Sequence, residues 1–222
     1  LNVIELQLPD LADRPDDIAA LDGLAHAHQT AGRLLPAVRS LDRATQLFQQ
    51  RGDAAGAAER MVRLGQLWRD VPDEGHATAA LRFRQALTLV PGHVEALLGL
   101  AETAEASGDF SRARAHLEDA LRATDGRVDE PQRVAIQLKL GALFAERLDA
   151  PDRAVVAYQK ALRGQPAQVE AAVQALDRLY SRQGRSEDLA RALSMAAEST
   201  PDPRARGAVL ARLAEVVAGL GD

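Results

Sequence analysis

The sequence of 222 residues contains no cysteine, and only 3% of its residues are aromatic. The lack of cysteine excludes disulfides and thiolate metal sites, and it allows a reducing compartment, so the cytoplasm is the favoured location. No apolar run reaches the roughly 18 residues that a membrane-spanning helix needs, which predicts no membrane insertion. The chain begins at Leu1 rather than Met, as we expect of a piece excised from a longer protein.

The net charge of −5 is concentrated near one end of the chain. Residues 1–30 contain six acidic side chains and one basic side chain, Arg14, so this stretch alone carries a charge of −5. The remainder carries equal numbers of acidic and basic side chains. Proteins that bind nucleic acid gather basic side chains on the surface that meets the phosphates. The neutral body therefore predicts that nucleic acid is not a partner.

Hydrophobic residues make up 46% of the chain, and with so few aromatics the core must consist mainly of alanine, leucine and valine. Such a core suits helices that approach one another closely. The stretch from Val94 to Asp125 shows the pattern, because two segments with apolar residues at helical spacing flank the turn Ser107-Gly108-Asp109. Versions of this unit recur, which predicts an all-α array of helical repeats.

Equivalent residues recur 76 positions apart. Gly32, Gly108 and Gly184 have this spacing, and so do Trp68 and Phe144. The larger period therefore contains two helical hairpins. We expect an N-terminal segment at 1–17, interpreted as the remnant of a preceding repeat, then repeats at 18–57, 58–93, 94–133, 134–169 and 170–203, and a closing helix or half repeat at 204–222, all within one solenoid.

Two units carry a characteristic set of residues. One contains Leu64-Gly65-x2-Trp68, Ala79-x3-Phe83, Ala86 and Pro91, and the other contains Leu140-Gly141-x2-Phe144, Ala154-x3-Tyr158, Ala161 and Pro166. These residues resemble the tetratricopeptide repeat (TPR) with its W-x2-L-G-x2-Y, A-x3-F and P pattern, and the whole is similar to long bacterial TPR arrays. The resemblance implies a right-handed α-solenoid of stacked antiparallel helix pairs, a TPR-like superhelix.

Small residues in this pattern have a packing role. Gly65, Ala101 and Gly141 lack bulk, so a partner helix can lie close to each of them. The fifth unit departs from the pattern, with Asp177 where a small residue is usual and Leu189 where alanine is usual. We therefore expect a local distortion in that unit.

The titratable residues form no catalytic or metal-binding motif. His26 and His28 lie two apart and so point to different faces of a helix, and His28 takes an aromatic packing position. His76, His93 and His116 are expected in solvent. The acidic pairs Asp16-Asp17 and Asp129-Glu130 are interpreted as helix caps. We expect a protein that is not an enzyme and that needs no cofactor or metal.

The resemblance implies a concave groove lined by the first helix of each pair. Carried onto this chain, the partner-binding residues are Gln66, Arg69, Glu95, Leu98, Glu102, Glu105, Leu138, Ala142, Gln174, Arg178 and Arg182, with Asp22, His26, Gln29, Val62, Ala145 and Ser181 on the same faces. This groove would be acidic near Glu102 and basic near Arg178. The first helices contain no Asn, which argues against the carboxylate clamp of chaperone-binding relatives.

These expectations favour a protein–protein interaction scaffold that binds a peptide or protein segment in the concave groove. Two alternatives stay open: a structural spacer or oligomerisation array within a larger protein, and a peptide-sensing regulatory domain. Self-association is expected to use the last helix, which carries Val209, Leu210, Leu213, Val216, Val217 and Leu220 with no second helix to cover them.

Overall fold

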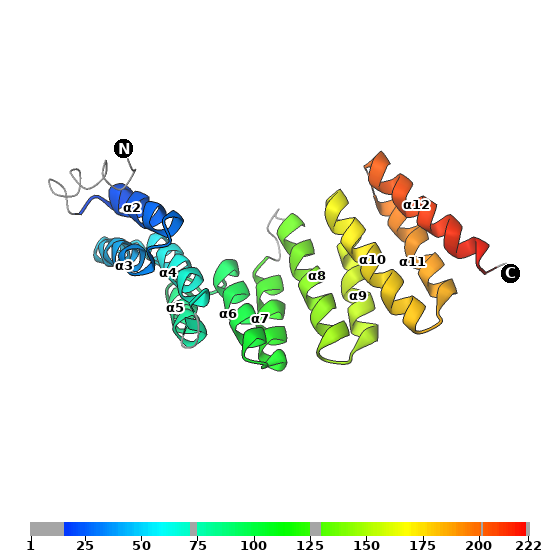
Figure 1. Cartoon of the computed structure of the whole chain (residues 1–222), viewed down its shortest axis with the longest axis horizontal. Helices are drawn as coiled ribbons and strands as arrows, with labels where there is room; N and C mark the ends of the chain where they lie inside the picture. Colours follow the sequence, from blue (N-terminus) through cyan, green and yellow to red (C-terminus); the bar gives the residue numbers. More distant parts are fainter. Residues whose placement is uncertain (1–15, 72–74, 125–129, 201, 221–222) are drawn as a thin grey trace. The chain divides into compact units, whose positions relative to one another are not determined.

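A computed structural model describes residues 16–71, 75–124, 130–200 and 202–220, and all regular secondary structure in these ranges is α-helical (Figure 1). The helices are α2 (Ile18–Thr30), α3 (Leu34–Gln50), α4 (Ala54–Arg69), α5 (Gly75–Leu89), α6 (Val94–Ala106), α7 (Phe110–Ala123), α8 (Glu130–Glu146), α9 (Pro151–Ala161), α10 (Pro166–Arg182), α11 (Ser186–Ser199) and α12 (Pro203–Ala218). The expected all-α class is confirmed.

The chain divides into two compact units, residues 1–123 with α2 to α7 and residues 124–222 with α8 to α12. Within each unit, consecutive helices pack on one another in antiparallel order, as Figure 1 shows. Alternate helices also touch, α4 with α6 in the first unit, and α10 with both α8 and α12 in the second. We call α2, α4, α6, α8, α10 and α12 the first helices, and the others the second helices. The expected stack of helix pairs is confirmed within each unit, and the division into repeats stays a prediction.

The glycines spaced 76 residues apart lie in three turns of the same geometry. Gly32, Gly108 and Gly184 have φ values of 69°, 76° and 65°, a left-handed conformation that glycine adopts without steric cost. In each turn, the N–H of the residue after the glycine donates to the carbonyl of the residue four positions before the glycine, at 2.8, 2.9 and 2.9 Å. These hydrogen bonds end the first helix and start the second, as the sequence predicts.

Glycine allows the close helix contacts that the sequence predicts. A Cβ built on Gly65 would lie 2.5 Å from Cε1 of Phe83, and one on Gly99 would lie 2.4 Å from Cζ of the same ring. Phe83 is fully buried, so its ring fills the space between α4, α5 and α6. A Cβ on Gly141 would lie 2.5 Å from Cε1 of the buried Tyr158. The helices can approach this closely because these positions have no side chain.

The fifth unit is regular, so the expected distortion is wrong. Helix α10 continues through Asp177, and α11 continues through Leu189, which is 2% exposed. Asp177 is tolerated because Arg212 on α12 donates to both of its carboxylate oxygens, at 2.7 and 2.9 Å. Leu189 is tolerated because it is part of the core.

Acidic residues near the start of the chain are paired or capping. Asp17 accepts hydrogen bonds from the N–H groups of Ala19 and Ala20 at 3.0 and 3.2 Å, which confirms its predicted role as a helix cap. Asp16 pairs with Arg43 on α3. The pair Asp129-Glu130 lies outside the residues whose side chains the structure describes.

We predict that Gly141→Leu lowers the free energy of unfolding by about 1–3 kcal/mol, because the new side chain displaces Tyr158 from a packed contact. Chemical denaturation measures this change. The control is Gly207→Ala on α12, where a Cβ meets nothing within 4 Å. Gly207→Ala should raise the free energy of unfolding by about 0.5–1 kcal/mol, since glycine is a poor helix former. An unchanged midpoint for Gly141→Leu would remove Gly141 from the helix contact.

We also predict a favourable coupling of about 0.5–1 kcal/mol between Asp177 and Arg212, the upper part of the range for partly exposed ion pairs. The side chains are 29% and 37% exposed, so solvent screens part of the attraction. A double-mutant cycle with Asp177→Asn and Arg212→Gln measures the coupling, and salt should reduce it. Additive effects of the two substitutions would contradict the interaction.

Candidate functional site

The predicted groove residues of the first unit lie on α4 and α6, and two of them bind each other. Arg69 on α4 forms an ion pair with Glu102 on α6, and both side chains are about one third exposed. Gln66, Glu95 and Glu105 are exposed, whereas Leu98 is half-buried. The charge of Arg69 and that of Glu102 therefore offset each other along this face.

Two other residues expected on the same faces do not present a free side chain. Val62 is 4% exposed and belongs to the core cluster that also contains Ala96 and Leu100 of α6, so its predicted place in the groove is wrong. Helix packing explains the correction, because Val62 faces α6. Asp22 on α2 pairs with Arg60 and Arg63 of α4. His26 and Gln29 are exposed on α2, as expected.

The predicted groove residues of the second unit lie on α8 and α10. Leu138, Ala142 and Ala145 are half-buried, and the polar residues are exposed, namely Gln174, Arg178, Ser181 and Arg182. Arg178 donates from Nε to the carbonyl of Gln174 at 3.3 Å, so its guanidinium lies along its own helix. Of the predicted set, Gln174 lines a cavity.

That cavity lies between the first helices α10 and α12 and has a volume of about 490 Å³. We call it the α10–α12 cavity. Its apolar lining consists of Pro166, Ala167, Val169 and Val173 from α10 and of Ala205, Ala208 and Val209 from α12. The sequence predicts Gln174 but not the other lining residues, because a contact between alternate helices leaves no periodic signal in either helix.

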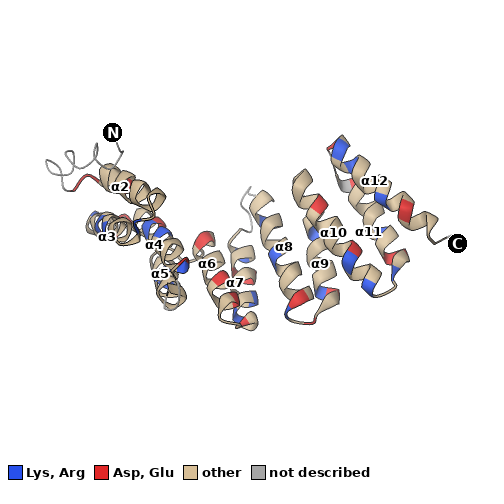
Figure 2. Ribbon diagram, in the orientation of Figure 1, with Lys and Arg blue, Asp and Glu red and all other residues tan. Residues whose placement is uncertain are grey.

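Polar side chains surround the apolar lining of the α10–α12 cavity. Glu170 accepts a hydrogen bond from Gln174 at 3.3 Å, and both side chains line the cavity. The Asp177–Arg212 ion pair also lines the cavity. Arg204 is exposed near the start of α12, where basic residues gather (Figure 2). An apolar centre with a polar border is the composition that binds an apolar side chain and orients the backbone that carries it.

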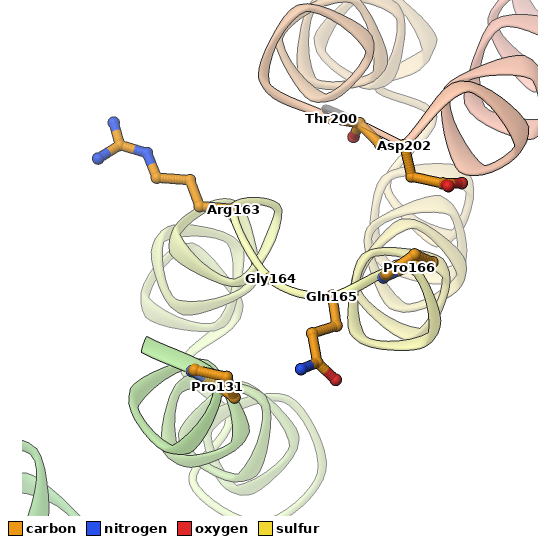
Figure 3. A pocket seen from close by; sticks show the side chains of 7 residues that line it. All are labelled: Pro131, Arg163, Gly164, Gln165, Pro166, Thr200 and Asp202. Carbon is orange, nitrogen blue, oxygen red and sulfur yellow. The ribbon is translucent and has the colours of Figure 1, made fainter. Parts of the chain in front are cut away.

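A smaller hollow of about 310 Å³ lies at the turns of the second unit, lined by Pro131, Arg163, Gly164, Gln165, Pro166, Thr200 and Asp202. Its polar side chains already have structural partners or point elsewhere. Asp202 accepts from the N–H of Ala205 at 2.7 Å, and Thr200 donates to the carbonyl of Ala196 at 2.6 Å. Figure 3 shows the Arg163 side chain extending away from the other lining residues. This hollow is a consequence of how the helix ends meet.

A third concavity, of about 700 Å³, lies in the first unit between the second helices α5 and α7. We call it the α5–α7 groove. Its lining residues are His76, Ala77, Ala80 and Arg84 of α5, Leu100, Thr103, Ala104 and Ala106 of α6 with the adjacent Ser107, and Arg112 and His116 of α7. The sequence does not predict this groove, since its basic residues belong to different repeats and share no spacing.

The histidines differ from the expectation of solvent exposure. His76 is exposed, as predicted, but His116 is half-buried in the α5–α7 groove. Burial lowers the pKa of His116, and the cations Arg112 and Arg84 lower it further, while Asp119 and Asp109 act in the opposite direction. His93 is also shielded, with 15% of its side chain exposed and Glu95 at 3.2 Å. His28 is half-buried, close to its predicted packing role.

The described ranges show neither a metal site nor a membrane span. They contain no group of three or more His, Asp and Glu side chains that could hold a metal ion. None of their helices is long and apolar enough to cross a membrane.

Residues 73–140 match the tetratricopeptide repeat family. A comparison with curated proteins found no match. Among solved structures, BtubC from P. vanneervenii is 17% identical with a TM-score of 0.65, covering 99% of this chain and 88% of its own. MamA is 17% identical with a TM-score of 0.60, covering 82% and 91%. YrrB, described as a TPR protein with an unusual peptide-binding site, is 17% identical with a TM-score of 0.58, covering 91% and 96%.

At these identities the solved structures show a common fold, while the family match identifies the repeat within it. The matched segment begins between α4 and α5, within the second expected pair, and ends in α8. Helix pairs of the same kind lie on both sides of it. The tetratricopeptide repeat is therefore identified at residues 73–140, and the chain shares its fold with TPR proteins of known structure.

Proposed function

We propose that the chain is a non-enzymatic scaffold that binds a peptide segment of a partner protein along its first helices. The observation that carries this proposal is the α10–α12 cavity, an apolar hollow bordered by polar side chains. Its volume of about 490 Å³ falls within the usual range of about 300–1,000 Å³ for ligand pockets. YrrB, which has the same fold, is described as having a peptide-binding site.

The cavity can hold one or two apolar side chains of a bound segment, with Val173 and Val209 as the surfaces they contact. Burying these side chains supplies the binding energy, since a few well-packed apolar anchors dominate most interfaces. Gln174 on the border can hydrogen-bond to the backbone of the segment. Arg178 and Arg182 follow at spacings of four residues on α10, so they lie on the same face and can meet carboxylates of the partner.

The first test fills the cavity. We predict that Ala208→Arg abolishes selection of cavity-binding peptides from a displayed random peptide library, because the long side chain occupies the hollow. Ala208 is exposed, so the substitution buries no charge and leaves the fold intact. The control is Ala214→Arg, an equally exposed alanine of α12 outside the cavity. Equal peptide selection by both variants would contradict the assignment.

The second test concerns the predicted basic end of the groove. We expect the double charge reversal Arg178→Glu, Arg182→Glu to weaken capture of cavity-binding peptides at least about tenfold, the effect of losing about 1.4 kcal/mol. Fluorescence anisotropy of the selected peptides measures the affinity. The control is Arg39→Glu, Arg51→Glu, which changes the net charge equally at exposed positions of the first unit. Unchanged affinity would remove Arg178 and Arg182 from the site.

Self-association is a second candidate, supported by apolar residues of α12. Leu210, Val217 and Leu220 are 47%, 52% and 45% exposed. Leu210 and Val217 lie seven residues apart and therefore share a helix face. If this face joins two copies, light scattering should show a concentration-dependent mass that Leu210→Lys, Val217→Lys reduces to that of one chain. A single-chain mass for the unsubstituted protein at all concentrations would exclude this role.

A further inference from the structure

The α5–α7 groove lies on the opposite side of the first unit from the predicted concave groove, and helix α6 shows this. Successive residues of an α-helix are rotated by about 100°. Leu98, Glu102 and Glu105 therefore share one face of α6, the face on which Glu102 pairs with Arg69 of α4. Leu100, Thr103 and Ser107 lie on the opposite face and line the α5–α7 groove. The two surfaces are separate sites.

The ionisable side chains that line the α5–α7 groove are all basic. Arg84 and His76 come from α5, Arg112 and His116 come from α7, and no Asp or Glu lines the groove among the residues that the structure describes. This cluster is unusual in a protein whose net charge is −5. The guanidinium groups of Arg84 and Arg112 repel each other, and an anionic ligand would relieve that repulsion.

The nearby carboxylates leave most of this positive charge available. Asp109 caps α7 by accepting from the N–H of Arg112 at 3.0 Å, and its other oxygen lies 3.4 Å from Nε of Arg112. Asp119 pairs with Arg122. Arg84 donates from Nε to the carbonyl of Ala80 at 3.1 Å, and it forms no ion pair with any residue that the structure describes.

The floor of the groove is apolar or small, which restricts the class of ligand. Ala77 and Ala80 line the α5 side, and Leu100 and Ala104 line the bottom. A volume of about 700 Å³ far exceeds one inorganic anion, and such an ion would gain nothing from this floor. Nucleic acid needs a wider basic surface than four side chains in an otherwise mixed-charge body. A chain with both acidic and apolar side chains fits best.

We propose that the α5–α7 groove is a second docking site, which binds an acidic peptide segment of a partner protein. Carboxylates of the segment pair with Arg84 on one wall and Arg112 on the other, and its apolar side chains rest on Leu100 and the alanines. The site is independent of the α10–α12 cavity, so the protein can hold two partners or two segments of one partner.

Binding at this site is linked to protonation of His116. In the free protein, burial keeps the pKa of His116 below its ordinary value of 6.5. The charged groups around it are Arg84 and His76 from α5 and Asp109, Arg112 and Asp119 from α7, while α6 contributes only uncharged lining residues. An acidic segment favours the protonated imidazole, so the pKa of His116 should rise on binding and affinity should increase as the pH falls toward the pKa of the free imidazole.

The experiment selects peptides from a displayed random library with the full chain and with two charge-reversal variants. Arg84→Glu, Arg112→Glu alters the groove, and Arg39→Glu, Arg51→Glu is the matched control. We expect acidic peptides with interspersed apolar residues that bind the full chain and the control alike and bind the groove variant at least tenfold more weakly. Ala208→Arg should leave these peptides bound, which separates this site from the α10–α12 cavity. NMR titration of His116 should show the upward pKa shift.

Three outcomes would overturn the proposal. The first is that no acidic peptide is enriched by the full chain over the Arg84→Glu, Arg112→Glu variant. The second is that the control loses binding equally, which would show a general charge effect. The third is that inorganic phosphate displaces the peptides completely and their apolar residues are dispensable, which would show a simple anion site.

Discussion

Aromatic rings lie against glycine where helices pack closely, both within a helix pair and between neighbouring pairs. Phe83 contacts the backbone at both Gly65 and Gly99, so one buried ring holds α4, α5 and α6 together. Tyr158 lies against Gly141 in the same way in the second unit. Because a hairpin cannot bury its own apolar face, contacts between pairs, such as that of Phe83 with Gly99, provide much of the stability of the array. The surfaces available for binding are the faces that this packing leaves exposed.

Packing of this kind gives the first and second helices different surroundings. Successive first helices of a unit lie close together, and basic and acidic residues pair between them. The pairs are Arg60 with Asp22, Arg69 with Glu102, and Arg212 with Asp177. The second helices α5 and α7 are separated by the end of α6, and among the described residues the basic side chains along their groove form no ion pair with another helix. The same repeat thus produces one face where charges pair between helices and another face where basic side chains do not. The two proposed sites therefore differ in chemistry although they lie on the same type of repeat.

The ion pairs also change how the concave face should be interpreted. A row of exposed charges along the first helices predicts a strongly charged groove, but pairing between neighbouring helices neutralises part of it. Partly exposed pairs contribute little to stability, generally less than about 1 kcal/mol each. Their main effect is to keep like charges from accumulating and to fix the register of adjacent helices. Affinity on this face is then expected to come from apolar anchors such as Val173 and Val209, with charge setting orientation.

The sequence by itself determined the features that depend on neighbours within a few residues: helix periodicity, the turns at Gly32, Gly108 and Gly184, and the cap at Asp17. It also determined the small residues at helix contacts, because the repeat pattern specifies them. Only the tertiary structure decided which residues of non-adjacent helices meet. It placed Val62 in the core, gave Asp177 a partner on α12, and assembled basic residues of α5 and α7 into one groove. The reason is physical, since these contacts depend on how far each helix is rotated and shifted against its neighbours, and no spacing within a single helix records that.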